Sequence, residues 1–378
     1  MKLLQICPEA PGKHSGGQLV IRQTLLSLAG NGWNVDYIGP VIEDPQIRAL
    51  YSHLYVLEPG NNVLLRVYDT LHGNTNQRYR SWKKLELDFD SYDGIVMEFT
   101  KLDYVLERVP KDRLFVRVHN VEADFSMKNF RYNRTINNYI DKILSPGREK
   151  KIVKEAAKLI VLTEKDRRRL EELYQVPDEK IVTIPVCVEN RRKMDGETAD
   201  EKTVNMILTG SLWFGPNYEG IKWFLKNVFT RLDIPCSLII AGARPNEELI
   251  GLISNMKGVT LVDSPESMEP YFQKSDLAIT PIFDGAGMKV KVAEALSYGL
   301  PVVGTSHAFE GYSIGHQVNS YHADSPEEFI ESIRHFYGLS QEGKRKMKSS
   351  SHRLFLECYS QERSCELFRQ VLERSGIL

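Results

Sequence analysis

Short apolar runs alternate with stretches of helical spacing along the first half of the chain. The first run, Lys2–Cys7, precedes a loop rich in glycine and proline, and then a helical pattern that ends at Gly30 and Gly32. Further strands of this series are expected at Asn34–Gly39, around Ile95, at Leu114–His119 and around Ile160. This alternation is typical of βαβ units, in which the strands pair in parallel.

A polar, charged stretch from Glu189 to Lys202 separates this series from a second one of the same kind. A helix is expected from Gly220 to Phe229, and strands are expected at 204–210, 236–242, 258–263, 277–282 and 301–305. We therefore predict an α/β protein with two Rossmann-like domains. The N-terminal domain would cover residues 1–188 and the C-terminal domain residues 189–355, and a helix in 356–378 would pack back on the N-terminal domain.

Composition narrows the possible functions only modestly. The 378 residues carry a formal net charge of -1, so nothing in the balance requires nucleic acid as a partner. The five cysteines form no CxxC pair, which gives no indication of a zinc site or a disulfide framework and agrees with a reducing cytoplasm. The first residues are too short an apolar run for a secretory signal, and no run is long enough to span a membrane. We expect a cytoplasmic protein.

The loop after the first strand does not have the pattern of a dinucleotide site. It reads PGKHSGG where GxGxxG is required, and the second strand ends at Gly39 and Pro40 without an acidic residue. Gly16 and Gly17 are then either an ordinary turn or a place where backbone N–H groups and a helix N-terminus approach an anion.

The loop after the strand at 277–282 places two lysines at the start of a predicted helix. Asp284, Gly285, Ala286 and Gly287 precede helical spacing from Met288 to Tyr298. Cations in a first helical turn oppose the helix dipole at a cost of about 0.3–1 kcal/mol each.

Two partners could offset that cost for Lys289 and Lys291. One is an ion pair of Lys291 with Glu294, worth about 0.2–0.5 kcal/mol. The other, which we favour, is a phosphate group bound by the loop amides, the helix N-terminus and both ammonium groups. Glu294 would then accept hydrogen bonds from the hydroxyls of a ribose.

This stretch resembles the donor-site signature of the retaining, family-four (group 1) glycosyltransferases of GT-B fold, in which two Rossmann-like domains face each other across an interdomain cleft. The resemblance rests on Glu294, Ala295, Gly299, Pro301, Val302 and Val303. It implies that Glu294 holds the nucleotide ribose and that the amides of 284–288 hold the diphosphate. Ala286 stands where the family has a second Glu that touches the donor sugar.

The segment Leu208–Leu225 resembles the strand and loop that open the second domain of these enzymes. Gly210 matches, but Ser211 stands where many members have an Arg on the phosphates, and no lysine follows before Lys222. Lys289 and Lys291 would supply the missing positive charge.

Two residues at the ends of strands complete the candidate site. His119 is followed by Asn120, and the resemblance implies a position near the donor sugar and the leaving phosphate. Glu98 also ends a strand and either faces the acceptor or is a surface carboxylate.

The resemblance implies transfer of a hexosyl group, with retention, from a nucleotide-diphosphate sugar to a glycan or lipid-linked acceptor in capsular, exopolysaccharide or other cell-surface glycan synthesis. Charge on the leaving diphosphate would be stabilised by Lys289 and Lys291 and by the amides of Gly17, Gly287 and Met288. The one Asp-x-Asp of the sequence, Asp88-Phe89-Asp90, lies outside the predicted donor-site loops, so we expect no metal and no other cofactor. The alternatives are a nucleotide-sugar epimerase and a non-catalytic nucleotide-sugar-binding protein.

Residues 128–158 combine an excess of Lys and Arg with Phe130, Tyr132 and Tyr139. The segment is either a solvated face or a peripheral contact with anionic lipid on the inner face of the membrane.

Overall fold

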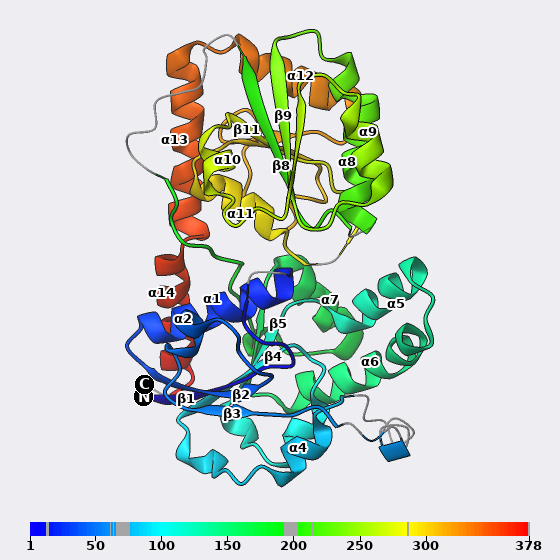
Figure 1. The fold of residues 1–378 in the computed structure, drawn as a ribbon. Helices are drawn as coiled ribbons and strands as arrows, with labels where there is room; N and C mark the ends of the chain where they lie inside the picture. Colours follow the sequence, from blue (N-terminus) through cyan, green and yellow to red (C-terminus); the bar gives the residue numbers. More distant parts are fainter. Residues whose placement is uncertain are drawn as a thin grey trace. The chain divides into compact units, whose positions relative to one another are not determined.

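The computed structural model separates the chain into two units (Figure 1). Unit 1 is Met1–Pro185 with Ser364–Leu378, and unit 2 is Val186–Arg363. The structure describes residues 1–12, 15–60, 62, 64–65, 76–192, 203–213, 215–285 and 287–376. The chain thus passes between the units twice, at 185/186 and at 363/364, where the sequence suggested 188/189 and 355/356.

Unit 1 contains a parallel sheet of seven strands in the order β3-β2-β1-β4-β5-β6-β7. The strands are β1 (Lys2–Ile6), β2 (Asn34–Gly39), β3 (Leu54–Val56), β4 (Gly94–Glu98), β5 (Leu114–Val118), β6 (Lys158–Val161) and β7 (Ile181–Thr183). Neighbouring residues of one strand face different cores: Leu3 and Val96 pack in one, and Leu4 and Ile95 in the other. A sheet covered on both faces requires continuous apolar strands, which is the pattern seen in the sequence.

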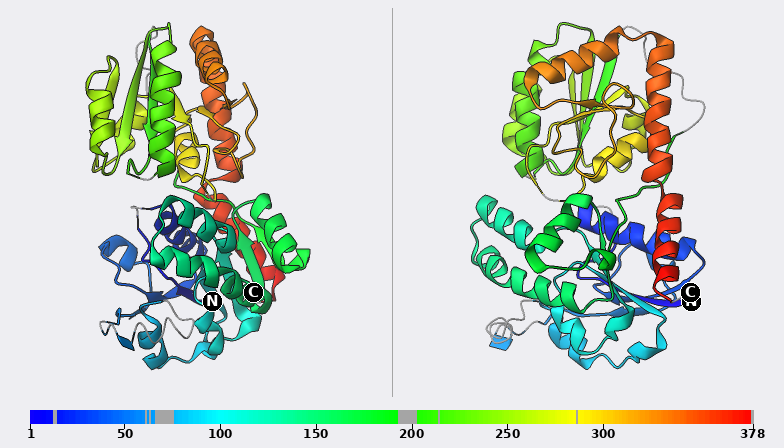
Figure 2. Two further views of the ribbon diagram at one scale, coloured as in Figure 1. Left: turned by 90° about the vertical axis from the view of Figure 1, so that its right-hand side faces the viewer. Right: turned by 180° about the vertical axis from the view of Figure 1, so that it is seen from behind.

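Helices cover both faces of this sheet (Figure 2). They are α1 (Gly16–Gly30), α2 (Pro45–Arg48), α4 (Tyr79–Lys84), α5 (Glu122–Tyr132), α6 (Ile136–Glu155), α7 (Glu164–Tyr174) and α14 (Gln361–Arg374). The part of α14 in unit 1 lies beside α1, where the hydroxyls of Ser27 and Ser364 are 2.7 Å apart and Phe368 is fully buried in the core. Short 3-10 helices lie at Phe89–Ser91, Asp103–Glu107, Lys111–Arg113 and Asp178–Lys180.

Unit 2 contains a second parallel sheet, of six strands in the order β10-β9-β8-β11-β12-β13. Its strands are β8 (Val204–Thr209), β9 (Cys236–Gly242), β10 (Val259–Asp263), β11 (Leu277–Thr280), β12 (Val302–Gly304) and β13 (Tyr321–His322). Its helices are α8 (Gly215–Asn227), η5 (Phe229–Arg231), α9 (Glu247–Ser254), α10 (Glu269–Gln273), α11 (Val290–Ser297), α12 (Pro326–Gly338) and α13 (Gln341–Cys358). The helix expected from Gly220 thus begins earlier, at Gly215.

Two glycines bring backbone segments of unit 2 into direct contact. A Cβ on Gly242 would lie 1.7 Å from the carbonyl oxygen of Gly210, and one on Gly220 would lie 2.0 Å from that of Pro281. Only a residue without a side chain fits at these two places. The close approach holds the ends of β8, β9 and β11 near one another, and the candidate site lies at these strand ends.

Candidate functional site

The candidate donor site lies where three neighbouring strands of unit 2 end. Strands β8, β11 and β12 are adjacent, so the loops that follow them emerge at the same edge of the sheet. Open parallel sheets bind ligands at this edge, outside the carboxyl ends of their strands.

The loop after β11 has the backbone of a ligand-binding turn. Gly285 has φ 130° and Gly287 has φ 64°, a region that residues with a side chain rarely adopt. The N–H of Gly285 donates to the carboxylate of Asp284 at 2.6 Å. Ala286, which the sequence placed at the sugar-reading position, lies outside the described residues.

Lys291 reaches from α11 to the loop after β8. Its ammonium donates to Asn217 Oδ1 at 2.8 Å, and Asn217 Nδ2 donates to the carbonyl of Ser211 at 3.0 Å. Gly210 has φ 148°, and a Cβ there would lie 2.7 Å from Lys291 Nζ. The structure therefore brings Lys291 together with Gly210 and Ser211.

The pKa of Lys291 is lowered to about 8: burial is the main cause, Glu294 acts in the opposite direction, and the neighbouring Lys289 ammonium contributes to the lowering. The ion pair with Glu294 was one explanation for a lysine at this position. Among the described residues, however, the hydrogen-bond partner of the ammonium is Asn217. Burial also raises the pKa of Glu294, against the effect of Lys291 and Arg191.

Lys289 is the N-cap residue of α11, and its side chain folds back over the loop. Its ammonium donates to the carbonyl of Gly287 at 2.7 Å, and its own carbonyl accepts from the Tyr312 hydroxyl at 2.9 Å. Met288 is buried, and its sulfur accepts from the N–H of Val186 at 3.4 Å. These contacts fix the loop that carries the two candidate phosphate-binding lysines.

His307 is a candidate that the sequence reasoning missed. It follows β12, and its Nδ1 lies 3.1 Å from Glu310 Oε1. Its Nε2 is buried, has no hydrogen-bond partner among the described residues, and lies 3.9 Å from the position of a Cβ on Gly285. The sequence feature that could have identified His307 is its position just after the predicted strand 301–305, at the same edge of the sheet as the loop that contains Gly285 and Gly287.

The candidates of unit 1 meet around the ring of Phe99. Phe99 follows β4 with φ 65°, and its ring stacks on His119 with 3.8 Å between the centroids. A Cβ on Gly17 would lie 3.0 Å from the edge of the Phe99 ring, whereas one on Gly16 would have no atom within 4 Å. Gly17 and His119 are thus brought to the same place, and the side chain of Ser15 caps the helix beside them by accepting from Gln18 N at 3.2 Å.

Glu98 is fully buried and contacts His119 directly. Its Oε2 lies 2.6 Å from His119 Nε2, and its Oε1 accepts from Gln5 Nε2 at 2.7 Å. Burial lowers the pKa of His119, and Glu98 acts in the opposite direction. Of the two interpretations of Glu98, the surface carboxylate is wrong, because its side chain is 0% exposed.

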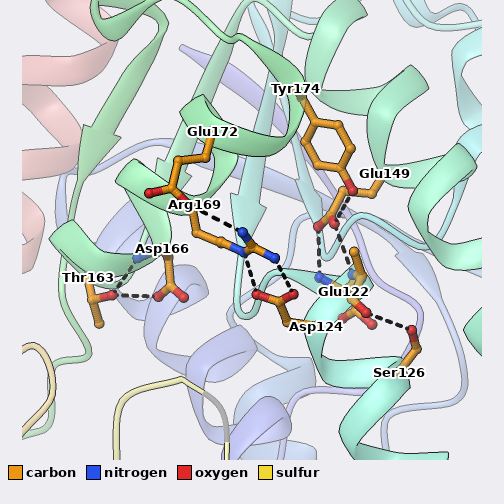
Figure 3. Close-up of polar contacts among 10 residues, drawn as sticks. Glu122, Asp124, Ser126, Glu149, Thr163, Asp166, Arg169, Glu172 and Tyr174 are labelled. Carbon is orange, nitrogen blue, oxygen red and sulfur yellow. Dashed lines mark hydrogen bonds and ion pairs between the residues drawn. The ribbon is translucent and has the colours of Figure 1, made fainter.

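A second buried carboxylate fixes the helix that starts just after His119 (Figure 3). Glu149 of α6 accepts from the N–H groups of Glu122 and Ala123 at 2.8 and 3.0 Å, from Thr100 Oγ1 at 2.9 Å and from the Tyr174 hydroxyl at 2.8 Å. No side chain of the N-cap residue bonds the helix, so Glu149 supplies the acceptors that the first turn of α5 requires. Figure 3 also shows Arg169 of α7 bonded to Asp124 of α5, at 2.8 and 2.9 Å.

Large apolar side chains are exposed along α5, α6 and the turn between them, within the basic segment 128–158. Ile136 is 75% exposed and Ile143 is 57% exposed, and Tyr132 and Tyr139 are also exposed. No helix in the described part of the chain is long and apolar enough to cross a membrane. Among the described residues, no group of three His, Cys, Asp or Glu side chains is arranged to hold a metal ion.

Comparison with known proteins agrees with the fold. Residues 203–338 match the profile of the family described as "Glycosyl transferases group 1". An uncharacterized 44.6 kDa protein in the cps region of Klebsiella pneumoniae is 24% identical in an alignment of 332 positions that covers 82% of this chain and 83% of that protein.

Solved structures share the fold over nearly the whole chain. Sucrose-phosphate synthase of Thermosynechococcus elongatus has a TM-score of 0.75 at 14% identity and covers 99% of both chains. Anabaena HepE in complex with UDP-glucose has a TM-score of 0.69 at 12% identity, over 98% of this chain and 99% of that one. The expectation of two Rossmann-like domains is confirmed: the chain has the GT-B fold, and its residues 203–338 are similar to the group 1 glycosyltransferases.

Proposed function

We propose that the protein transfers a hexosyl group from a nucleotide-diphosphate sugar to a glycan or lipid-linked acceptor, with retention at the anomeric carbon. The observation that carries this proposal is the convergence of Lys289 and Lys291 with three glycines of positive φ, which are Gly210 after β8 and Gly285 and Gly287 after β11. Ammonium groups, exposed loop amides and a helix N-terminus together favour a dianionic ligand. The GT-B neighbour from Anabaena that binds UDP-glucose supports the same ligand class.

The chemistry proposed for this site is stabilisation of charge. When the glycosidic bond breaks, negative charge develops on the diphosphate, and fixed positive charge nearby lowers the barrier. Lys289 and Lys291, with the amides of Gly287 and Met288, would supply it in unit 2. Glu294, one turn further along α11, would accept hydrogen bonds from the ribose hydroxyls. In unit 1 the Gly17 amide is proposed to assist. No metal ion is needed in this scheme.

The binding part of the proposal is tested with a double variant, Lys289→Ala with Lys291→Ala. Isothermal titration with UDP, GDP, ADP and TDP identifies the diphosphate that binds. The variant should then lose at least tenfold in affinity for that diphosphate and little for the corresponding nucleoside, since two charged hydrogen bonds contribute about 1.5–3 kcal/mol each. Lys257→Ala, at an exposed position of the same unit, is the control. Equal diphosphate binding by the double variant and the control would refute the site.

The catalytic part is tested with radiolabelled nucleotide sugars and lipid-linked or oligosaccharide acceptors. A labelled glycoside whose anomeric proton coupling matches that of the donor would establish transfer with retention. Isomerised donor without an acceptor product would instead identify an epimerase. Binding of donor without turnover for every acceptor would identify a non-catalytic nucleotide-sugar-binding protein.

The relative in the cps region supports a role in capsular or other cell-surface polysaccharide synthesis. Acceptors of such pathways are often carried on lipid, and we place the protein in the cytoplasm with a peripheral contact at the inner membrane face. The exposed apolar side chains of α5 and α6, set among Lys and Arg, support that contact. Apolar side chains would enter the interface while the cations attract anionic lipid.

A further inference from the structure

A chain of four buried side chains ends at His119 in unit 1. The Tyr51 hydroxyl donates to Gln5 Oε1 at 2.7 Å, Gln5 Nε2 donates to Glu98 Oε1 at 2.7 Å, and Glu98 Oε2 lies 2.6 Å from His119 Nε2. Gln5 and Glu98 are 0% exposed and His119 is 3% exposed. The four residues come from β1, the segment before β3, the end of β4 and the end of β5, so the order of the strands brings them together.

The proton positions in this chain follow from its geometry. Gln5 Nε2 also donates to the backbone carbonyl of Ile21 at 3.2 Å, and a carbonyl can only accept. The amide orientation of Gln5 is therefore fixed, and both of its N–H groups are used. Its second N–H points at Glu98 Oε1, so that oxygen must be an acceptor.

One proton remains to be assigned, between Glu98 Oε2 and His119 Nε2. An ionised carboxylate only accepts hydrogen bonds, so the proton in this contact belongs on Nε2. The lone pair of the neutral ring is then on Nδ1, which is buried and has no hydrogen-bond partner among the described residues. Phe99 is stacked on the ring and opposes a flip that would put a ring carbon in the place of each nitrogen.

The surroundings of the ring as a whole also favour the neutral form. Burial is the main cause of the lowered pKa of His119; Glu98 acts in the opposite direction, and the cations Arg117 and Lys101 add to the lowering. A neutral ring with Nε2–H cannot donate from Nδ1. Phosphate oxygens only accept hydrogen bonds, so an Nδ1 lone pair suits a hydroxyl and not a phosphate.

We propose that Glu98 is a positioning residue, oriented by Gln5 and Tyr51, that holds His119 in the Nε2–H form so that Nδ1 accepts a hydrogen bond from a sugar hydroxyl. This inference rests on the proposed function for the presence of a sugar, which is either the donor hexose or the acceptor. It assigns Glu98 a role through His119 in place of a direct contact with the acceptor, and it gives His119 a hydroxyl partner in place of the leaving phosphate.

The ring state can be measured without any substrate. Long-range proton–nitrogen spectra of the full-length protein labelled with ¹⁵N-histidine report which ring nitrogen carries the proton, and the His119 signals are assigned by their loss in His119→Asn. We expect Nε2–H in the wild-type protein. In Glu98→Gln, whose amide can donate to Nε2, we expect the Nδ1–H form. Glu107→Gln, an exposed Glu to Gln change in the same unit, should leave the signals unchanged.

An Nδ1–H ring in the wild type, or an unchanged ring in Glu98→Gln, would overturn the assignment of Glu98. Because these spectra need no ligand, their outcome stays separate from that of the proposed glycosyl transfer. A protein that transfers no sugar can still confirm the Glu98–His119 pair, and an active one can still refute it.

The hydroxyl is tested by kinetics, with UDP-glucose as the first donor and the best donor of the binding panel as the second. Glu98→Gln should lower kcat/KM about 2- to 10-fold, the size of one lost hydrogen bond between neutral groups. If the hydroxyl bonded to His119 belongs to the donor, the rate of donor hydrolysis without acceptor should fall together with kcat/KM for transfer. If it belongs to the acceptor, hydrolysis is kept and the KM for the acceptor rises. Unchanged rates in both assays, with an altered ring state, would refute the sugar contact.

Discussion

The pH dependence of nucleotide binding offers the sharpest test of Lys291. Its ammonium donates to Asn217 beside Gly210, and burial lowers its pKa to about 8. The perturbation is a change of pH from 7 to 9, in the wild type and in Lys291→Arg. Arginine keeps its charge at every pH in this range, so the substitution removes the titration and retains the cation.

The expected magnitude follows from the pKa. With a pKa of about 8, Lys291 is about nine-tenths protonated at pH 7 and about one-tenth protonated at pH 9. A bound diphosphate favours the charged form and returns the pKa toward the ordinary value, so binding at pH 9 must also take up a proton. Affinity should therefore fall about tenfold between pH 7 and pH 9, or about 1.4 kcal/mol. This value is an upper limit because the half-buried side chain is partly screened by water.

The stability of the ligand-free protein should change with pH in the opposite direction to its affinity for the diphosphate. Because the folded pKa lies below the unfolded one, the charged ammonium destabilises the fold below pH 8, and this penalty disappears as the pH rises toward the unfolded value near 10.4. The ligand-free wild type should thus gain stability relative to Lys291→Arg over this range. Urea unfolding at pH 7 and pH 9 measures the difference.

Isothermal titration with the tightest-binding nucleoside diphosphate at pH 7, 8 and 9 gives, for each protein, the slope of affinity against pH. We expect the wild-type slope to be absent in Lys291→Arg, and Lys257→Arg to retain it. Titration of the nucleobase itself is common to all three proteins and cancels in the comparison. Identical slopes for the wild type and Lys291→Arg would refute the reasoning.

Two further predictions concern unit 1. Replacing Glu149 by Ala leaves buried donors unpaired and should lower the free energy of unfolding in urea by about 3–5 kcal/mol. The control Glu172→Ala removes an exposed ion pair with Arg169 and should lower it by under about 1 kcal/mol. Similar losses in the two variants would contradict the role of Glu149. The double variant Ile136→Ser with Ile143→Ser should bind phosphatidylglycerol-containing vesicles about 10- to 100-fold more weakly in co-sedimentation, whereas the control Leu173→Ser should bind them as the wild type does. Undiminished binding of the double variant would exclude this surface as the membrane contact.

The sequence predicted the longer elements of the fold well. Runs such as Leu114–Val118 and Val204–Thr209 are mostly apolar because both faces of a parallel sheet are covered, and they were recognised as strands. The sequence reasoning did not identify β3, β7 and β13, which have two or three residues each. Such short segments pair at or near the sheet edges and are defined by their neighbours more than by a pattern of their own.

The candidate site was predicted in part. The glycines of the loop after β11 were recognised, because a left-handed backbone leaves a clear signal in the residue type. His307 was missed, because a lone histidine after a strand resembles many structural histidines. Its relevance comes from Nε2, which is buried near Gly285.

What the sequence determined by itself is the alternation of strand and helix, the tandem of two parallel sheets and the loops that carry glycine and lysine. These features depend on residues close together in the chain, through the spacing of apolar side chains and the backbone freedom of glycine. Only the tertiary structure decided which polar side chains meet. Lys291 bonds Asn217 across 74 positions and Gln5 bonds Glu98 across 93, because the order of the strands in the sheet, and not local spacing, determines which strand ends are neighbours.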